Sequence, residues 1–164
     1  MKILGIDPGY GLCGFALIEK EKSKLTLATC GVFRTKPKTN FADRLCEIAD
    51  DFASLLKKYK PDVVSIEDLF FVKNVTTGLQ VAQVRGILVL LSQKAGARVV
   101  EPKPVEVKSC FTGSGKATKC DMKKMAKMIF KLKSAIHVDD AADAIAVAYW
   151  AAQDSSKRDR EIER

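Results

Sequence analysis

The sequence predicts an α/β fold in which helices cover the faces of a mixed sheet that includes an antiparallel meander. Two observations lead to this prediction. Three short apolar runs near the N-terminus are joined by tight connections, which is typical of a meander. Further along, segments with the helical spacing of apolar residues alternate with short apolar runs, which is typical of a sheet covered by helices. With 164 residues, of which 47% are hydrophobic, the chain has the size and composition of one domain with its own core.

Five runs are expected to form the strands of this sheet. They are short and apolar, and they span Lys2–Asp7, Gly14–Ile18, Leu25–Phe33, Asp62–Glu67 and Arg98–Glu101. The charged turn Glu19–Lys24 separates the second run from the third. The first run and the fourth each end in an acid, so each of these strands is expected to carry a carboxylate to an end of the sheet.

Five segments are expected to be helical: Asn40–Tyr59, Val75–Ala95, Pro104–Phe111, Lys119–Leu132 and Ala141–Ala152. In the first, apolar residues recur at alternating spacings of four and three, which places them in one stripe. Thr39 or Asn40 can cap its first turn, and Pro61 marks its end. In the fourth, an apolar stripe lies opposite an arc of lysines. The fifth is rich in alanine and can pack closely on its neighbours.

The segment Val75–Ala95 is apolar nearly all the way round, and a helix of this kind has more than one buried face. Gly78, Ala82 and Gly86 recur every fourth residue and form a stripe of small side chains. Each interior glycine costs about 1 kcal/mol of helix stability relative to alanine, and close approach by another helix would explain that cost. We hypothesise that one face of this helix packs on the sheet and another on a second copy of the chain.

The order of these elements is three strands, a helix, a strand, a helix, a strand and then helices. This is the order of the ribonuclease-H-like fold, a mixed sheet with a meander on one side and helices on its faces. We expect residues 1–153 to form this domain. Residues 154–164 hold four acidic and four basic residues with no periodic apolar pattern, so we expect a mobile C-terminal tail there.

The composition argues against several classes of protein. No apolar run reaches the roughly 18 residues needed to span a bilayer, and the N-terminus lacks the small-residue cleavage site of a signal peptide. We therefore expect a soluble, cytoplasmic protein with no membrane partner. The five cysteines show no C-x-x-C spacing and there is a single histidine, which argues against a zinc site. The thiols are expected to be reduced and to fill gaps in the packing.

The net charge of +8 is unevenly distributed along the chain. Between Pro102 and Ser134 there are nine lysines and only two acids, so that stretch alone carries a charge of +7. One basic face on a nearly neutral body suits a polyanion, and nucleic acid is the leading candidate. The alternative is a solvated helix face that serves solubility, and charge by itself does not separate the two.

Four acids are candidates for a reactive site. Asp7 and Glu67 each end an apolar strand, and Pro8 keeps Asp7 in an extended conformation. Asp140 and Asp143 are three residues apart, so they share a helix face within an otherwise apolar stretch. Taken singly, each acid has an ordinary alternative, such as a turn, an ion pair with a lysine or a helix cap. Two strand-end acids followed by a D-x-x-D pair form a much more specific pattern.

If these strands and the helix converge, the carboxylates cluster, and such a cluster destabilises a fold unless a cation lies between the charges. Hard oxygen ligands and a phosphate substrate favour Mg²⁺. Two ions about 3.5–4 Å apart can activate a water and stabilise the leaving oxygen in phosphodiester hydrolysis. We expect two Mg²⁺ per subunit, with Mn²⁺ able to substitute, and the expected ligands are Asp7, Glu67, Asp140 and Asp143.

Four segments of the chain resemble the RuvC family: Ile3–Gly9, Ile66–Asn74, Gln83–Gly86 and Asp140–Ala146. They occur in family order and at family spacing, so the resemblance extends from about Lys2 to Ala148. It implies a ribonuclease-H-like nuclease domain, a homodimer, and magnesium-dependent nicking of four-way (Holliday) junction DNA at paired symmetric positions in recombination and DNA repair. The implied products have 5′-phosphate ends, and the implied partner is a branch-migration motor, although no motif here shows one.

The resemblance also implies roles for single residues. The implied catalytic residues are Asp7, Glu67, Asp140 and Asp143 as metal ligands, with Lys108 and Lys119 near the scissile phosphate. Phe70 matches an aromatic residue that stacks on a base near the crossover, an interaction worth about 1–3 kcal/mol. The residues that we expect to contact DNA are Phe70, Lys73, Lys108, Lys116, Lys119 and Lys123. Asp139 is an extra acid beside Asp140 that could compete for metal.

Other interpretations account for parts of the pattern. Residues 113–118 (GSGKAT) resemble the end of a P-loop but lack its first glycine and the hydroxyl residue after the lysine, so a flexible lysine-bearing loop is expected. Asp7-x-Gly-x-Gly is similar to a phosphate loop of sugar kinases and actin-like ATPases, which place their nucleotide between two domains of this topology. A related nuclease acting on RNA–DNA hybrids or structured RNA would carry much the same acids. A catalytically silent DNA-binding module would gain nothing from carboxylates that repel phosphate.

Overall fold

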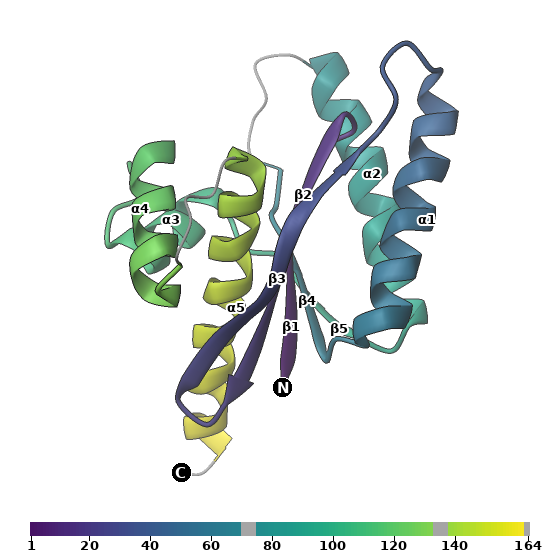
Figure 1. Ribbon diagram of the computed structural model, residues 1–164. Helices are drawn as coiled ribbons and strands as arrows, with labels where there is room; N and C mark the ends of the chain where they lie inside the picture. Colours follow the sequence, from purple (N-terminus) through teal and green to yellow (C-terminus); the bar gives the residue numbers. More distant parts are fainter. Residues whose placement is uncertain (70–74, 133–137, 163–164) are drawn as a thin grey trace.

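The computed structural model describes residues 1–69, 75–132 and 138–162, with the backbone alone for residues 75 and 155–162. Its five strands form one sheet in the order β3-β2-β1-β4-β5, shown in Figure 1. The strands are β1 (Lys2–Asp7), β2 (Leu12–Glu21), β3 (Lys24–Arg34), β4 (Val63–Ile66) and β5 (Arg98–Val100). β1, β2 and β3 pair antiparallel, while β4 pairs parallel with β1 and β5 parallel with β4. The predicted mixed sheet with an antiparallel meander is confirmed.

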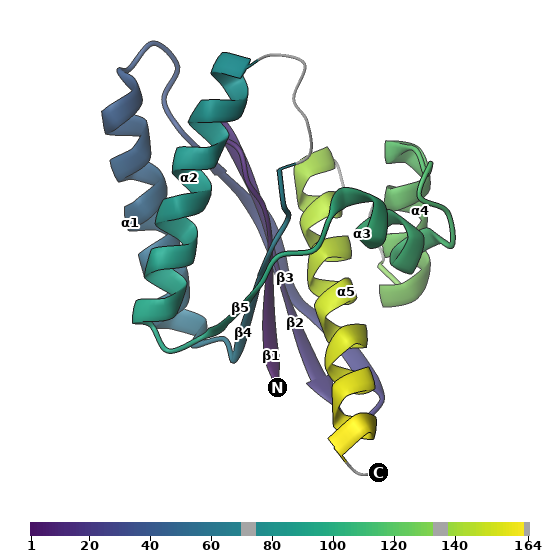
Figure 2. The same cartoon turned by 180° about the vertical axis from the view of Figure 1, so that it is seen from behind.

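Helices cover both faces of this sheet, as Figures 1 and 2 show from opposite sides. The helices are α1 (Phe41–Tyr59), α2 (Val75–Lys94), α3 (Pro104–Thr112), α4 (Lys119–Phe130) and α5 (Asp139–Ile162). α1 and α2 lie on one face, whereas α5 lies on the other with α3 and α4 packed against it. Among the residues described, no helix combines the length and the hydropathy needed to cross a membrane.

Several expected boundaries were wrong, although each expected element is present. β2 and β3 are longer than expected and turn at Lys22, which takes a left-handed φ of 53°. Asn40 caps α1, since its side chain accepts a hydrogen bond from the Asp43 N–H. α5 continues to Ile162 rather than ending at Ala152. Charged residues with good helix propensity prolong a helix without an apolar stripe. That residues 154–164 are mobile stays a prediction, and residues 163–164 lie outside the described part of the chain.

Side chains of the central strand β1 alternate between two buried layers, as the pleat of a strand requires. Leu4 and Ile6 pack toward α1 and α2 in one cluster, with Phe52 among their partners. Ile3 packs toward α5 in another cluster that contains Ala148. Both layers are apolar and fully enclosed, so they hold β1 and its terminal Asp7 in a fixed position between the helices.

Two glycines allow α5 to lie directly on the sheet. A Cβ at Gly5 would stand 2.4 Å from the backbone oxygen of Ala144, and a Cβ at Gly14 would stand 2.0 Å from the backbone oxygen of Asp140. Real Cβ atoms do not approach backbone oxygens so closely, so neither position has room for a side chain. The close contact at Gly14 brings the first turn of α5, with its acids, against the end of β1 that carries Asp7.

Candidate active site

Three carboxylates converge where β1 ends and α5 begins. Asp7 is the last residue of β1, whereas Asp140 and Asp143 belong to the first turns of α5. Each offers one carboxylate oxygen, and these three oxygens lie within 4.8 Å of one another. All three residues are partly exposed, so a ligand can reach them from solvent. Residues that are more than 130 positions apart in the sequence therefore form one acidic site.

Glu67 lies beside this group rather than within it. It follows β4, whose parallel register with β1 pairs Ile6 with Ile66, and its N–H donates a hydrogen bond of 3.1 Å to the Ile6 oxygen. The Glu67 side chain lines a small cleft together with Asp143. The four predicted acids thus occupy one end of the sheet, although Glu67 is not among the three that meet within 4.8 Å.

The pKa values of three of these acids are raised, because the carboxyl groups are buried and lie close to one another. Burial, followed by the charges of Glu67, Asp143 and Asp140, raises the pKa of Asp7 well above its usual value. Burial and then the charge of Asp143 raise the pKa of Glu67 to about 7. The pKa of Asp143 is raised too, mainly by burial. Acids with raised pKa values bind protons readily, and a divalent cation would relieve the same repulsion.

Two of the predicted lysines face these acids. Lys108 on α3 and Lys119 at the start of α4 line the same cleft as Glu67 and Asp143. Lys108 lowers the pKa of Glu67, and Lys119 lowers that of Asp7, so both ammonium groups act on the acids through their charge. Burial opposes the charged form of Lys119, but the neighbouring Asp139 and Asp143 outweigh it and raise the pKa of Lys119.

Asp139 faces α4 instead of joining the acidic group. Its carboxylate forms ion pairs with Lys123 and, at 3.5 Å, with Lys119. The hydrogen bond from Lys123 is the main reason that the pKa of Asp139 is lowered. The sequence identified Asp139 as a possible competing ligand and missed its role as the partner of the two lysines. Asp139 begins α5, the helix that follows α4 in the chain, so local spacing would not have shown this pairing.

The other predicted DNA contacts are more scattered. Lys123 is tied to Asp139, and Lys116 is exposed and lines a separate hollow between the residues 113–118 and α4, together with Lys124. Phe70 and Lys73 lie outside the described residues. Their predicted contacts with DNA are therefore not placed by the structure.

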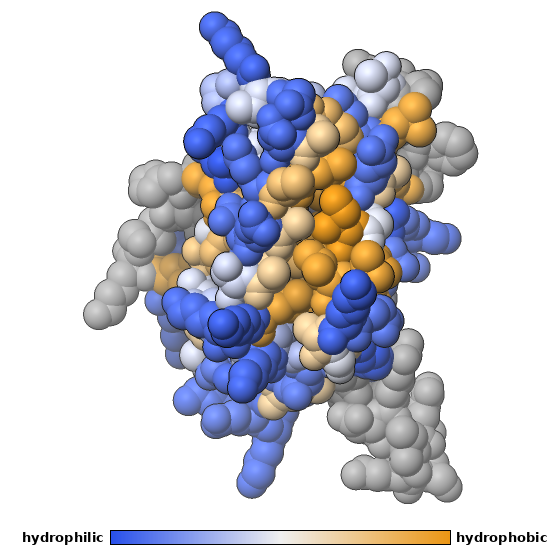
Figure 3. All heavy atoms as spheres, turned by 90° about the vertical axis from the view of Figure 1, so that its right-hand side faces the viewer, coloured by the Kyte–Doolittle hydropathy of each residue, from blue (hydrophilic) through white to orange (hydrophobic). Residues whose placement is uncertain are grey.

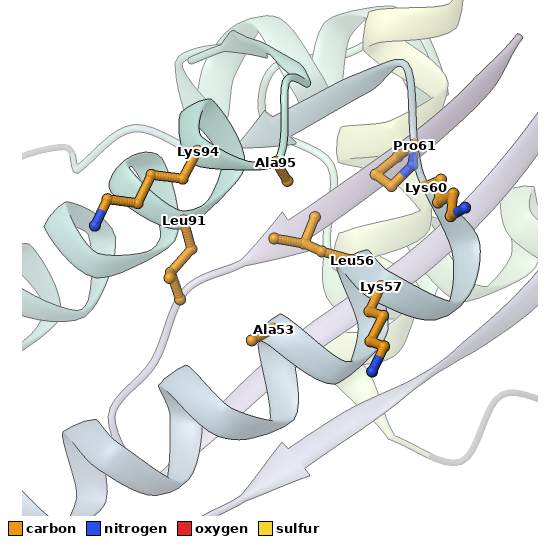
Figure 4. Close-up of a pocket in the computed structure, with 8 residues that line it drawn as sticks. All are labelled: Ala53, Leu56, Lys57, Lys60, Pro61, Leu91, Lys94 and Ala95. Carbon is orange, nitrogen blue, oxygen red and sulfur yellow. The ribbon is translucent and has the colours of Figure 1, made fainter.

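Another hollow lies at the opposite end of the sheet. Figure 4 shows it between the C-terminal ends of α1 and α2, where Leu56 and Leu91 line it and Lys57, Lys60 and Lys94 surround it. None of the residues that line it is acidic, so it lacks ligands for a hard cation. Among the described residues, Asp7, Asp140 and Asp143 form the group of possible ligands that lie close enough together to hold a metal ion.

Comparison with known proteins agrees with this picture. Residues 3–150 match the family described as crossover junction endodeoxyribonuclease RuvC. The RuvC of Thermosipho melanesiensis is 42% identical over 149 residues, which is 91% of this chain and 95% of that protein. The RuvC of Brevibacillus brevis is 42% identical over 153 residues, covering 93% of this chain and 92% of that protein.

Solved structures show the same fold. T. thermophilus RuvC in complex with a Holliday junction substrate superposes with a TM-score of 0.86 at 28% identity, covering 93% of each chain. The yeast mitochondrial Holliday junction resolvase superposes with a TM-score of 0.69 at 18% identity, covering 96% of this chain and 81% of that one, which shows likeness of fold. The ribonuclease-H-like prediction is confirmed by these neighbours. With a family match over nearly its whole length and relatives that match over more than nine-tenths of both chains, this chain belongs to the RuvC family of crossover junction endodeoxyribonucleases.

Proposed function

We propose that this chain is a magnesium-dependent endonuclease that resolves four-way DNA junctions by paired, symmetric nicks, in recombination and repair in the cytoplasm. The observation that carries the proposal is the convergence of Asp7, Asp140 and Asp143 within 4.8 Å. Carboxylates repel a phosphate backbone, so a cluster of this kind is of use to a DNA-binding protein only with a cation. Family membership supplies the class of substrate.

The residues at this site fit a hard divalent cation. The donors are carboxylate oxygens with no thiol or imidazole among the three residues that meet, which suits Mg²⁺ and also Mn²⁺. We propose Asp7, Asp140, Asp143 and Glu67 as the ligands of two ions per subunit. Such ions, when bound, activate the attacking water and stabilise the leaving oxygen of the phosphodiester.

Lysines beside the acidic cleft would hold the DNA over the carboxylates. Lys108 and Lys119 border the acidic cleft, so they can bind the oxygens of the phosphate that lies over the carboxylates. Lys116, which precedes α4 in the chain, and Lys124 and Lys127 on α4 are exposed and add positive charge to this part of the surface. Phosphate contacts of this kind position the DNA without reading its sequence. We propose that Phe70 and Lys73, which follow Glu67 in the chain, contact the unpaired bases and backbone near the crossover.

A homodimer is the second part of the proposal, because two cuts of a four-way junction need two active sites. The outer face of α2 exposes Leu79 by 60% and Leu90 by 53%. Figure 3 shows an apolar band on this side of the molecule, bordered by hydrophilic residues. A Cβ at Gly86 would meet nothing within 4 Å, so packing within the chain does not require this glycine. Close approach of a second α2 would account for both features. A branch-migration motor is the further partner that we propose.

The test is cleavage of a synthetic four-way junction, with a linear duplex of the same sequence as its control, each with Mg²⁺ and with EDTA. We expect paired nicks in the junction with Mg²⁺ and none in the duplex. Asp7→Asn should abolish cleavage yet keep junction binding, because it removes a ligand and also a charge that repels phosphate. Cleavage of an RNA–DNA hybrid in preference to the junction, or full activity of Asp7→Asn, would contradict the proposal.

A further inference from the structure

Arg85 is a charged residue within the largely apolar helix α2, and it holds two acids at once. One guanidinium nitrogen lies 2.9 Å from Oδ1 of Asp68, and the other pairs with Oε1 of Glu101. The Arg85 side chain is only 14% exposed, whereas those of Asp68 and Glu101 are 39% and 46% exposed. A largely buried guanidinium with two partners differs from a surface ion pair, which contributes little to stability.

The first acid belongs to the segment that carries Glu67. Asp68 directly follows Glu67, and its Oδ1 also accepts a hydrogen bond of 2.8 Å from the Leu69 N–H. The Asp68 N–H donates to the Pro102 oxygen at 2.8 Å. The chain leaving β4 is therefore attached to α2 through a side chain and to the β5–α3 connection through its backbone, which restricts where the Glu67 carboxylate can point.

The second acid belongs to the segment that carries Lys108. Glu101 follows β5 and precedes Pro102, which accepts the hydrogen bond from Asp68. The chain then enters α3 at Pro104, and α3 brings Lys108 to the cleft that Glu67 lines. Arg85 thus joins the two connections that deliver an acid and a lysine to one cleft, although it is absent from the residues lining that cleft.

We propose that Arg85 is a positioning residue of the nuclease, which holds Glu67 and Lys108 in register with the other acids. This inference rests on the proposed function. Hydrophobic residues of similar size often replace a buried ion pair without loss of stability, so stability alone does not require an arginine here. Holding two connections in a fixed relation favours arginine, because a planar guanidinium binds two carboxylates in a defined geometry, whereas an ammonium group on a flexible stem does not fix their directions.

The sign of the effect on metal binding separates positioning from simple electrostatics. Arg85→Gln removes a positive charge near the acidic site, which by charge alone would tighten the binding of a cation. If Arg85 positions Glu67, the same variant should weaken the binding of the cation. The expected loss of affinity is about tenfold, as is usual for residues that orient a metal ligand. Arg85→Lys keeps the charge but loses the two-way contact, so it should also bind the metal more weakly.

The experiment is calorimetric titration of the metal-free protein with Mn²⁺ in the absence of DNA. Arg98→Gln is the matched control, because Arg98 is an exposed arginine at the start of β5 outside this network. The double variant Asp68→Asn with Arg85→Gln leaves the net charge unchanged and should bind Mn²⁺ as weakly as Arg85→Gln. Circular dichroism and the midpoint of thermal unfolding confirm that each variant is folded. If Arg85→Gln does not fold, Arg85→Lys and the double variant carry the test.

Weaker Mn²⁺ binding by both Arg85 variants, with Arg98→Gln unchanged, would support the positioning role. Unchanged or tighter binding by folded Arg85→Gln would overturn it, as would full rescue by Arg85→Lys, because the two-way contact of the guanidinium would then not be needed. The two proposals fail in different ways. If the unaltered chain neither binds Mn²⁺ nor cuts the junction, the proposed function fails. If the unaltered chain is active but the Arg85 variants bind Mn²⁺ as tightly as it does, only the positioning role is refuted.

Discussion

Removing the charge of Glu67 should stabilise the metal-free protein, and it should do so only toward neutral and alkaline pH. Burial and the neighbouring Asp143 raise the pKa of Glu67 from 4.5 to about 7. Below pH 4.5 the carboxyl is protonated in the folded and in the unfolded chain, so it carries no penalty. Between 4.5 and about 7 the unfolded chain ionises while the folded chain keeps its proton, so stability falls as the pH rises.

The size of this effect follows from the two pKa values. A difference of one proton changes the free energy of unfolding by about 1.4 kcal/mol per pH unit. From 4.5 to about 7 the loss reaches about 3 kcal/mol, which is a large part of the stability of a small domain. Glutamine has the same shape and does not ionise, so Glu67→Gln should gain less than about 1 kcal/mol at pH 5 and up to about 3 kcal/mol at pH 8.

Urea denaturation in EDTA at pH 5 and at pH 8 measures this difference directly. Glu21→Gln, at the exposed end of β2, is the matched control for the removal of a glutamate. An equal effect of Glu67→Gln at the two pH values, or a loss of stability at pH 8, would refute the reasoning. Saturating Mg²⁺ at pH 8 should reverse the order, because the unaltered protein gains the free energy of metal binding while the variant lacks a ligand.

Three further variants test other parts of the site. Lys119→Ala should slow junction cleavage in single-turnover experiments more than it weakens junction binding, and equal losses would assign Lys119 to phosphate positioning. Gly14→Ala should lower the unfolding midpoint and weaken Mn²⁺ binding, because its Cβ would stand 2.0 Å from the Asp140 oxygen. Gly11→Ala, which meets nothing within 4 Å, should change neither, and equal behaviour of the two would disprove the close-contact argument. Gly86→Leu should convert the proposed dimer to a monomer in sedimentation equilibrium without loss of folded structure, and a persisting dimer would exclude this face of α2.

The sequence by itself determined which elements form and which acids stand at their ends. Short apolar runs predicted five strands and the spacing and composition of longer segments predicted five helices, and each is present. Asp7 at the end of β1 and the Asp140–Asp143 pair at the start of α5 were visible for the same reason, since local periodicity locates the end of a strand and one face of a helix. The boundaries were less well predicted, because where a helix stops depends on small differences in propensity, as the extension of α5 to Ile162 shows.

Only the tertiary structure decided how these residues meet. The absence of side chains at Gly5 and Gly14 sets how closely α5 approaches the sheet, and this depends on contacts across the sheet that no local pattern records. The same packing places Glu67 beside the three closest acids, turns Asp139 toward the lysines of α4, and brings Arg85 between two connections. Distances of a few ångströms between residues remote in the chain control pKa values and metal binding, since electrostatic interactions act through space rather than along the backbone.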